Sequence, residues 1–230
     1  MALYTIADLH LPLGIDKPMD IFGKAWENYV ERLADNWQSV VKKNDVVVLP
    51  GDFSWATYLE QSVKDFEYLH KLNGKKILLK GNHDYWWSTK KKMDDFLIAE
   101  GCRSIEILHN NHFRYENYGI CGTRGWVSIK GETTDEKVLK REVQRLETSI
   151  KSALAENLQP IVFMHYPPIF ATNFNYDILD VLYRYNIKDC YYGHIHGRSA
   201  HELCIKNTYD GINFHLIAGD YLQFIPEKVL

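Results

Sequence analysis

The fold is decided at Val46-Val47-Val48-Leu49-Pro50-Gly51-Asp52. Three valines and a leucine in succession predict a β-strand, and an apolar run without alternation is typical of a strand buried on both faces of a parallel sheet. Gly51 permits the sharp turn that ends such a strand, and Asp52 places a carboxylate directly beyond it. The stretch therefore predicts a buried strand that runs into a polar loop.

The same pattern occurs on both sides of this stretch. Upstream, the apolar run at residues 3–7 ends at Asp8-Leu9-His10. Downstream, three more short apolar runs end in polar residues: 76–80 before Gly81-Asn82-His83-Asp84, 160–164 before His165, and 190–192 before Gly193-His194-Ile195-His196. We therefore expect five polar clusters at five strand ends.

Helix-like segments lie between these strands. Apolar residues recur at three- and four-residue spacing at about residues 21–42, 59–72, 88–100 and 135–156, which predicts amphipathic helices. Shorter strand-like pieces at residues 105–126, separated by Asn110-Asn111 and Asn117-Tyr118-Gly119, predict hairpins, as do residues 202–217 around Asp210-Gly211. Alternating strands and helices, together with hairpins, predict a layered α/β fold with mixed sheets.

Length and composition narrow the class of protein. A chain of 230 residues that is 46% hydrophobic and 25% charged can bury a full core, and we expect one domain over residues 1–230. No stretch approaches the roughly 20 apolar residues of a membrane helix, and no secretory leader precedes the first strand, which favours a cytoplasmic protein. The net charge of −3 disfavours binding to extended nucleic acid.

The five polar clusters contain the side chains that bind metals. The carboxyl ends of strands in open α/β sheets converge on one edge, so these carboxylates, imidazoles and one amide are expected to meet there. Such a mixture suits divalent transition metals. Taken singly, each Asp is a common turn former and each His a common packing residue. Together and without a cation, however, they would repel one another and lose solvation, at a cost of a few kcal/mol.

In this order the clusters resemble the signature of the calcineurin-like metallophosphoesterase superfamily. The resemblance covers residues 8–196 and lacks no expected metal position. It implies a four-layer αββα sandwich, in which two mixed β-sheets pack face to face with helices outside. It also implies an enzyme, a metal-dependent phosphoesterase.

The resemblance further implies two divalent metal ions, with manganese, iron or zinc as the leading candidates. Asp52 would bridge both ions. One ion would be held by Asp8, His10, Asp52 and His196, and the other by Asp52, Asn82, His165 and His194. A hydroxide held between the two ions, roughly 3.5 to 4 Å apart, would attack the phosphorus of a phosphate ester.

Other roles near the centre are expected from the residues beside the ligands. By resemblance His83 would be the general acid at the leaving oxygen, and Asp84 would hold the second ring nitrogen of His83. Arg124 follows a strand and would bind a phosphate oxygen, or else pair with a surface carboxylate. Asp220 reads as structural, and His201 matches no motif position. The loops at residues 14–23 and 128–135 could each form a lid.

The substrate and one alternative function stay open at this level. The substrate is expected to be a small-molecule or nucleotide phosphate ester, and the metal ligands do not separate a monoester from a diester. The alternative is a catalytically silent scaffold that keeps the fold for protein binding. That alternative predicts eroded ligands, whereas the expected set is complete. The sequence gives no indication of the oligomeric state.

Overall fold

The computed structural model describes residues 1–126 and 136–230. The predicted loop at residues 128–135 therefore lies outside the described residues.

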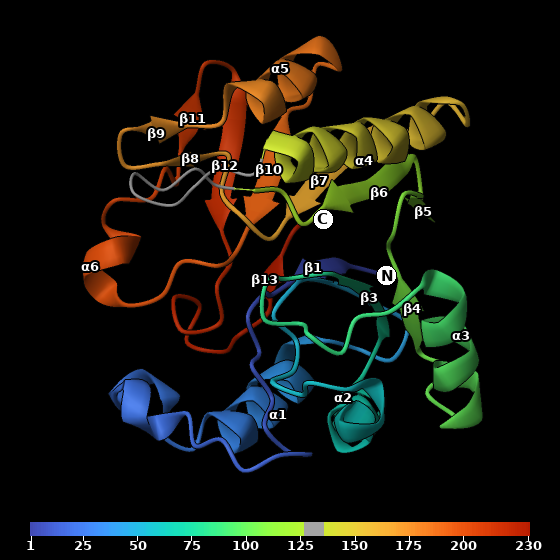
Figure 1. The fold of residues 1–230 in the computed structure, drawn as a ribbon, viewed down its shortest axis with the longest axis vertical. Helices are drawn as coiled ribbons and strands as arrows, with labels where there is room; N and C mark the ends of the chain where they lie inside the picture. Colours follow the sequence, from blue (N-terminus) through green and yellow to red (C-terminus); the bar gives the residue numbers. More distant parts are fainter. Residues whose placement is uncertain (127–135) are drawn as a thin grey trace.

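Two large sheets form the centre of the molecule (Figure 1). The first has the order β13-β1-β2-β3-β4, and β1 to β4 run parallel. Its strands are β1 (Leu3–Thr5), β2 (Val46–Pro50), β3 (Lys75–Leu79), β4 (Ile105–Ile107) and the antiparallel edge strand β13 (Glu227–Lys228). Every residue of β2 is buried, as its unbroken apolar sequence predicts.

The second sheet has the order β11-β12-β10-β7-β6-β5. Its four central strands are parallel, and both edge strands are antiparallel. The strands are β5 (Phe113–Tyr115), β6 (Tyr118–Thr123), β7 (Gln159–Met164), β10 (Asp189–Tyr192), β11 (Thr208–Tyr209) and β12 (Ile212–Leu216). A separate small ribbon pairs β8 (Ile169–Phe170) with β9 (Asn173–Phe174).

Helices cover the outer faces of both sheets, so the chain forms four layers (Figure 1). The first sheet carries α1 (Tyr29–Val40), α2 (Val63–Lys71) and α3 (Lys90–Ala99). The second carries α4 (Glu136–Leu154) and α5 (Tyr176–Arg184), and the short α6 (Arg198–His201) lies beyond its edge. The mixed α/β sandwich predicted by resemblance is confirmed.

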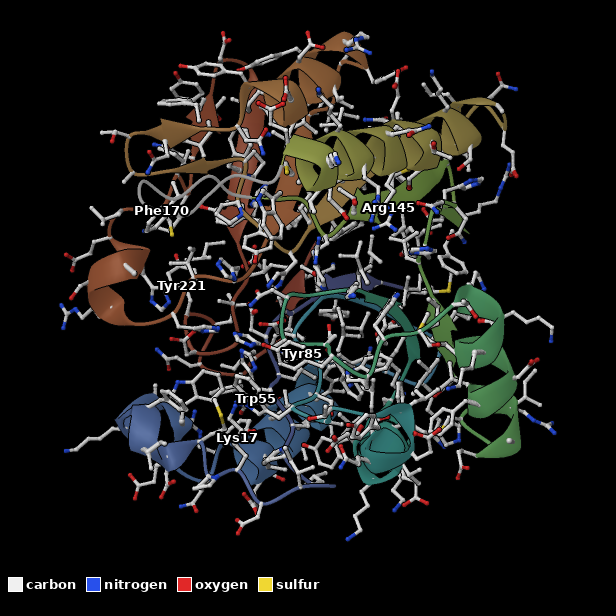
Figure 2. The ribbon with its side chains drawn as sticks, in the orientation of Figure 1. Lys17, Trp55, Tyr85, Arg145, Phe170 and Tyr221 are labelled. Carbon is white, nitrogen blue, oxygen red and sulfur yellow. The ribbon has the colours of Figure 1, made fainter. Side chains whose placement is uncertain are left out.

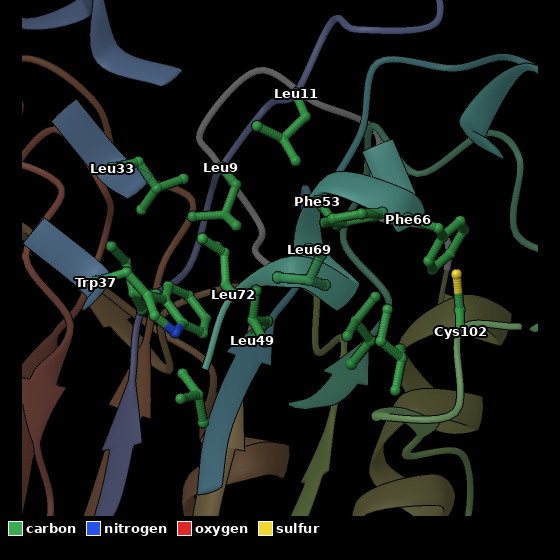
Figure 3. Close-up of a cluster of buried hydrophobic side chains, with 14 of the residues drawn as sticks. Leu9, Leu11, Leu33, Trp37, Leu49, Phe53, Phe66, Leu69, Leu72 and Cys102 are labelled. Carbon is green, nitrogen blue, oxygen red and sulfur yellow. The ribbon is translucent and has the colours of Figure 1, made fainter. Parts of the chain in front are cut away.

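Apolar side chains fill the spaces between these layers. One cluster joins the first sheet to its helices through residues such as Trp37, Leu49 and Phe66 (Figure 3). A second lies between the other sheet and α4 and α5, and a third lies between the two sheets. The sheets are also linked through the backbone, because the amide of Ala7 donates to the carbonyl oxygen of Ile217 at 2.9 Å. These contacts fix the two halves of the polar edge relative to each other.

Several elements differ from the sequence prediction. The single helix expected at residues 21–42 is two 3-10 turns, Asp20–Phe22 and Lys24–Trp26, followed by α1, because Gly23 and Asn28 have φ of 112° and 49° and interrupt the helix. The hairpin expected at Asn110-Asn111 is wrong, since the chain crosses there from β4 in one sheet to β5 in the other. The helix α5 was not predicted.

Within the described residues, none of the helices combines the length and apolar character that crossing a membrane requires.

Candidate metal centre

The predicted ligands meet at the carboxyl ends of five parallel strands. Asp8 and His10 follow β1, Asp52 follows β2, and Asn82 follows β3 in the first sheet. His165 follows β7, and His194 and His196 follow β10 in the second. The loops are also bonded to one another, because the amides of Asp8 and His10 donate to the carbonyl oxygens of Gly51 and Asp52.

A first group of ligand atoms comes from Asp8, His10 and His196, whose atoms all lie within 4.8 Å of one another. The two Nε2 atoms of His10 and His196 face each other at 3.2 Å. Nε2 of His196 lies 3.8 Å from Oδ1 of Asp8. Three potential donors to one cation thus converge here.

A second group comes from Asp52, His165 and His194, again within 4.8 Å. Nε2 of His165 lies 3.6 Å from Oδ1 of Asp52 and 2.5 Å from Oδ1 of Asn82. Asn82 therefore joins this group through its amide oxygen.

Asp52 belongs to the second group and also reaches the first. Its Oδ1 faces His165 of the second group at 3.6 Å, and its Oδ2 faces Nε2 of His10 in the first group, also at 3.6 Å. The amide of His83 donates to Oδ1 at 2.8 Å and holds the carboxylate in this orientation. One carboxylate thus presents an oxygen to each group.

The backbone is strained where it presents these side chains. Asp8, His10, Asp52 and His194 all have φ between 46° and 71°, a region that non-glycine residues rarely adopt. Such conformations cost about 1–3 kcal/mol each and persist where the surrounding structure fixes them. Backbone hydrogen bonds from Asp8 to Gly51 and from His10 to Asp52 join the loops that carry three of these residues.

Two glycines allow the loops to approach each other. A Cβ on Gly51 would lie 2.6 Å from the Cα of Gly81 and 2.7 Å from Nδ1 of His165. A Cβ on Gly81 would overlap both the Oδ1 and the backbone nitrogen of Asp52. Only glycine fits at either position without moving a candidate ligand.

Hydrogen bonds on the far side of two rings direct their Nε2 atoms inward. Nδ1 of His165 lies 3.1 Å from the carbonyl oxygen of Pro50, which can only accept, so the proton sits on Nδ1 and the lone pair on Nε2. Nδ1 of His196 lies 2.9 Å from Oδ1 of Asp220, with the same consequence. A partner on the second nitrogen is what metal-binding histidines usually have.

The electrostatics of the site fit a pair of cations. Burial, followed by the charge of Asp52, raises the pKa of Asp8 well above its ordinary value, and burial and Asp84 raise the pKa of Asp52. Burial lowers the pKa of His10 and His165, and lowers that of His194 to about 3. Oδ1 of Asp8 and Nδ1 of His10 are buried without a hydrogen-bond partner in the described residues. Cations would neutralise the carboxylates, and neutral imidazoles are ready to bind them.

His83 and Asp84 are not paired with each other, contrary to the sequence prediction. The Asp84 carboxylate is fully buried and accepts from the backbone amides of Asp52, Phe53 and Gly81 and from the indole of Trp86. Nδ1 of His83 is buried without a partner in the part of the chain that the structure describes. Asp84 therefore anchors the loops that carry Asp52 and Asn82, and it does not orient His83.

Arg124 lies beside a carboxylate of α4. Its Nη2 is 3.4 Å from Oε1 of Glu142, a side chain that is buried, whereas the sequence suggested a surface partner. Its guanidinium also stands 5.0 Å from the ring centre of Trp126. A contact between Arg124 and a phosphate oxygen stays a prediction.

A cleft of about 760 Å³ opens beside the first group of ligands. His10, His83 and His196 are among the residues that line it. Trp26 and Trp55 form part of its wall and contact the ring of His10, at centroid distances of 5.7 and 4.5 Å. A molecule in this cleft would have direct access to the candidate centre.

Asp220 is the residue that sequence reasoning missed. Besides His196, its carboxylate accepts from the amide of Gly197 at 2.9 Å and lies 3.4 Å from Nε2 of His201. A signal did exist, because Ala218-Gly219-Asp220 follows the strand β12 as Pro50-Gly51-Asp52 ends β2. Asp220 thus belongs to the site, as the partner of a candidate ligand.

Three solved structures share this fold at low identity. A protein of unknown function from Aquifex aeolicus is 15% identical with a TM-score of 0.53, and the match covers 99% of this chain and 95% of that one. A phosphopantetheinyl hydrolase from Mycobacterium tuberculosis is 14% identical with a TM-score of 0.52, over 100% and 95%. A protein from Thermus thermophilus is 13% identical with a TM-score of 0.52, over 85% and 82%. At such identities the likeness shows the fold alone.

A comparison with curated proteins gives no match. The family model for calcineurin-like phosphoesterases matches residues 1–198, and this range includes all of the predicted metal ligands. With the five loops at one edge and the two ligand groups, this match places the chain in the calcineurin-like phosphoesterase family.

Proposed function

We propose that the protein is a two-metal phosphoesterase that hydrolyses a small-molecule or nucleotide phosphate ester. The observation that supports this most strongly is the position of Asp52, whose two oxygens face two separate groups of ligand atoms. A carboxylate shared in this way is suited to holding two cations at short distance.

The proposed ligand sets follow the two groups. Asp8, His10, His196 and Asp52 would hold one ion, and Asp52, Asn82, His165 and His194 the other. When bound, two divalent ions polarise the phosphoryl oxygens and lower the pKa of a water so that it becomes a nucleophile near neutral pH. The donor set of oxygen and nitrogen atoms accepts manganese, iron or zinc.

His83 is proposed as the proton donor to the leaving oxygen. Its ring lines the cleft, with its centroid 4.6 Å from that of the Trp55 ring. Burial, aided by the charges of Lys17 and His196, lowers its pKa, so the ring is neutral at pH 7 and carries one proton. Its buried Nδ1 has no partner in the described residues, so this ring is not committed to a structural hydrogen bond there. It can therefore turn its N–H toward a substrate oxygen.

The function is tested by metal content and turnover together. Protein purified with added Mn²⁺ is expected to hold two ions per chain and to hydrolyse an aryl phosphate monoester or diester. If the protein held two ions but hydrolysed neither ester, the proposal that it is a phosphoesterase would be wrong. Protein that takes up no ions and hydrolyses neither ester would support the scaffold alternative.

Replacing His83 by Ala should slow hydrolysis by about 10²- to 10⁴-fold for esters with poor leaving groups, because these need a proton in the transition state. Activated aryl esters should slow much less, and the metal content should stay at two ions. The ratio of kcat/KM for an alkyl and a nitrophenyl ester measures the effect. Equal slowing of the two esters would contradict a role in proton donation.

Replacing Asp220 by Ala should weaken the binding of one of the two ions by about 10- to 100-fold, because His196 loses the partner that orients it. Titration calorimetry with Mn²⁺ on metal-free protein measures this. Asp189→Ala is the matched control, since Asp189 pairs with His215 at 3.3 Å away from the centre. Equal affinities in the two variants would show that Asp220 does not position the ligand.

A further inference from the structure

The cleft beside the centre is larger than a phosphoryl group needs. Its volume of about 760 Å³ falls within the range of roughly 300–1,000 Å³ that pockets for drug-sized ligands occupy. A phosphate ester of a small polar alcohol would leave most of this space to water. The size of the cleft therefore indicates a substrate with a large group attached to the phosphate.

The walls of the cleft are mainly apolar and aromatic. Met19 and Trp26 are buried in them, and the indole nitrogen of Trp55 donates to the sulfur of Met19 at 2.8 Å. Phe22 and Tyr221 stand at the mouth, with 58% and 38% of their surface exposed. In Figure 2, Tyr221 lies on the side of α6 and Trp55 on the side of the N-terminal segment. Solvent-exposed rings at a cleft mouth gain free energy when an apolar ligand covers them.

The charged residues that line the cleft are Lys24, Arg198 and Asp220, and Lys17 lies next to the lining residue Trp55. Nζ of Lys17 lies 3.0 Å from the ring centre of Trp55 (Figure 2) and pairs with no carboxylate among residues 1–126 and 136–230. The one carboxylate in the wall, Asp220, is already engaged by His196 and Gly197. A cation next to His83 suits the anionic end of a ligand, and the apolar walls suit its other end.

We propose that this cleft binds the leaving group of the substrate, and that the substrate is a phosphate ester whose leaving group is an extended apolar chain or ring system. This inference rests on the proposed function. The occupant is the leaving group because His83, the proposed proton donor to the leaving oxygen, lines the cleft. The phosphate then lies at the centre, beside Lys17, and the apolar body runs out past Phe22 and Tyr221.

Binding of alkylphosphonates tests the inference without any need for turnover. These compounds carry a C–P bond in place of the ester bond, so they bind without being hydrolysed. Calorimetry on manganese-supplemented protein is expected to show Kd falling by about threefold for each methylene from methyl- to hexylphosphonate. The heat capacity change should become more negative with length. Equal Kd values for the methyl and hexyl compounds would overturn the inference.

Substitutions at two neighbouring residues distinguish the loss of a side chain that lines the cleft from a general disturbance of the loop. Phe22→Ser should raise the Kd for hexylphosphonate by about tenfold, because it removes a ring from the wall. Ile21→Ser is the control, since Ile21 is 72% exposed in the same turn but does not line the cleft, and its Kd should match that of the unaltered protein. The same loss in both variants would overturn the assignment of the wall.

The phosphonate titration tests the inference about the cleft, and the hydrolysis assay tests the proposed function, so either one can be wrong without the other. If Kd falls with chain length while no phosphate ester is hydrolysed, the cleft is an apolar binding site and the proposed function is wrong. If esters are hydrolysed while Kd is independent of chain length, the proposed function stands and the leaving group lies elsewhere.

Discussion

Asp52→Asn is expected to reduce kcat/KM by about a thousandfold or more, which corresponds to about 4 kcal/mol of transition-state stabilisation. The reason is that Asp52 offers one oxygen to each group of ligand atoms, at 3.6 Å from His10 and from His165. An amide has the same shape but lacks the negative charge that offsets the repulsion of two cations. Metal analysis together with steady-state kinetics measures both consequences, and both ions should bind more weakly.

The control lies at the opposite end of the same strand. Asp45 precedes β2 as Asp52 follows it, and its carboxylate accepts from the amides of Ala2 and Lys42. Asp45→Asn should lower the melting temperature by a few degrees and leave two ions and full turnover. If Asp52→Asn retained activity within a few-fold of the unaltered protein, the bridging role would be wrong.

Gly81→Ala is the second change with a large expected effect. The added methyl group would overlap the Oδ1 and the backbone nitrogen of Asp52, and neither can move without displacing the loop after β2. We expect turnover to fall by more than about a hundredfold, because small displacements of positioned groups have effects of this size. Overpacking of this kind also costs about 1–3 kcal/mol of stability. Thermal unfolding, metal content and kcat should be measured on the same sample.

Gly101→Ala is the control that shows the effect of replacing a glycine outside the candidate site. Gly101 has φ of 72°, so alanine is strained there, but its Cβ would meet nothing within 4 Å. That variant should lose some stability and keep its turnover. If Gly81→Ala behaved in the same way, the fit between Gly81 and Asp52 would not be required for activity.

The layered fold and the common edge of the candidate ligands were predictable from the sequence. The strand β2 is apolar at every position because both of its faces are buried, and Gly51-Asp52 marks where it ends. Each of the other four clusters has the same relation to its strand. The packing of two sheets against each other was predicted from the family resemblance, because hydrophobic periodicity says which face is buried but not against what.

The contacts that the sequence did not reveal are tertiary ones. Asp84 is next to His83 in the chain, yet its side chain turns inward to accept from the amides of Asp52, Phe53 and Gly81. Neighbours in an irregular loop need not point the same way, so adjacency was a poor guide there. In the sequence, the only indication that Asp220 belongs to the site is the glycine that precedes it after a strand. Its hydrogen bond to His196 joins residues that are 24 positions apart in the chain.

Residues near the end of the described chain add to the candidate site and to the first sheet, both of which are formed mainly by earlier residues. Asp220 follows β12, and β13 closes the first sheet by pairing with β1. A ribosome produces residues 212–230 only after all the candidate ligands between Asp8 and His196 have been made. A nascent chain therefore contains every ligand before it contains the carboxylate that orients His196. The candidate centre therefore acquires its full geometry only after residues 212–230 have been made and β13 has paired with β1.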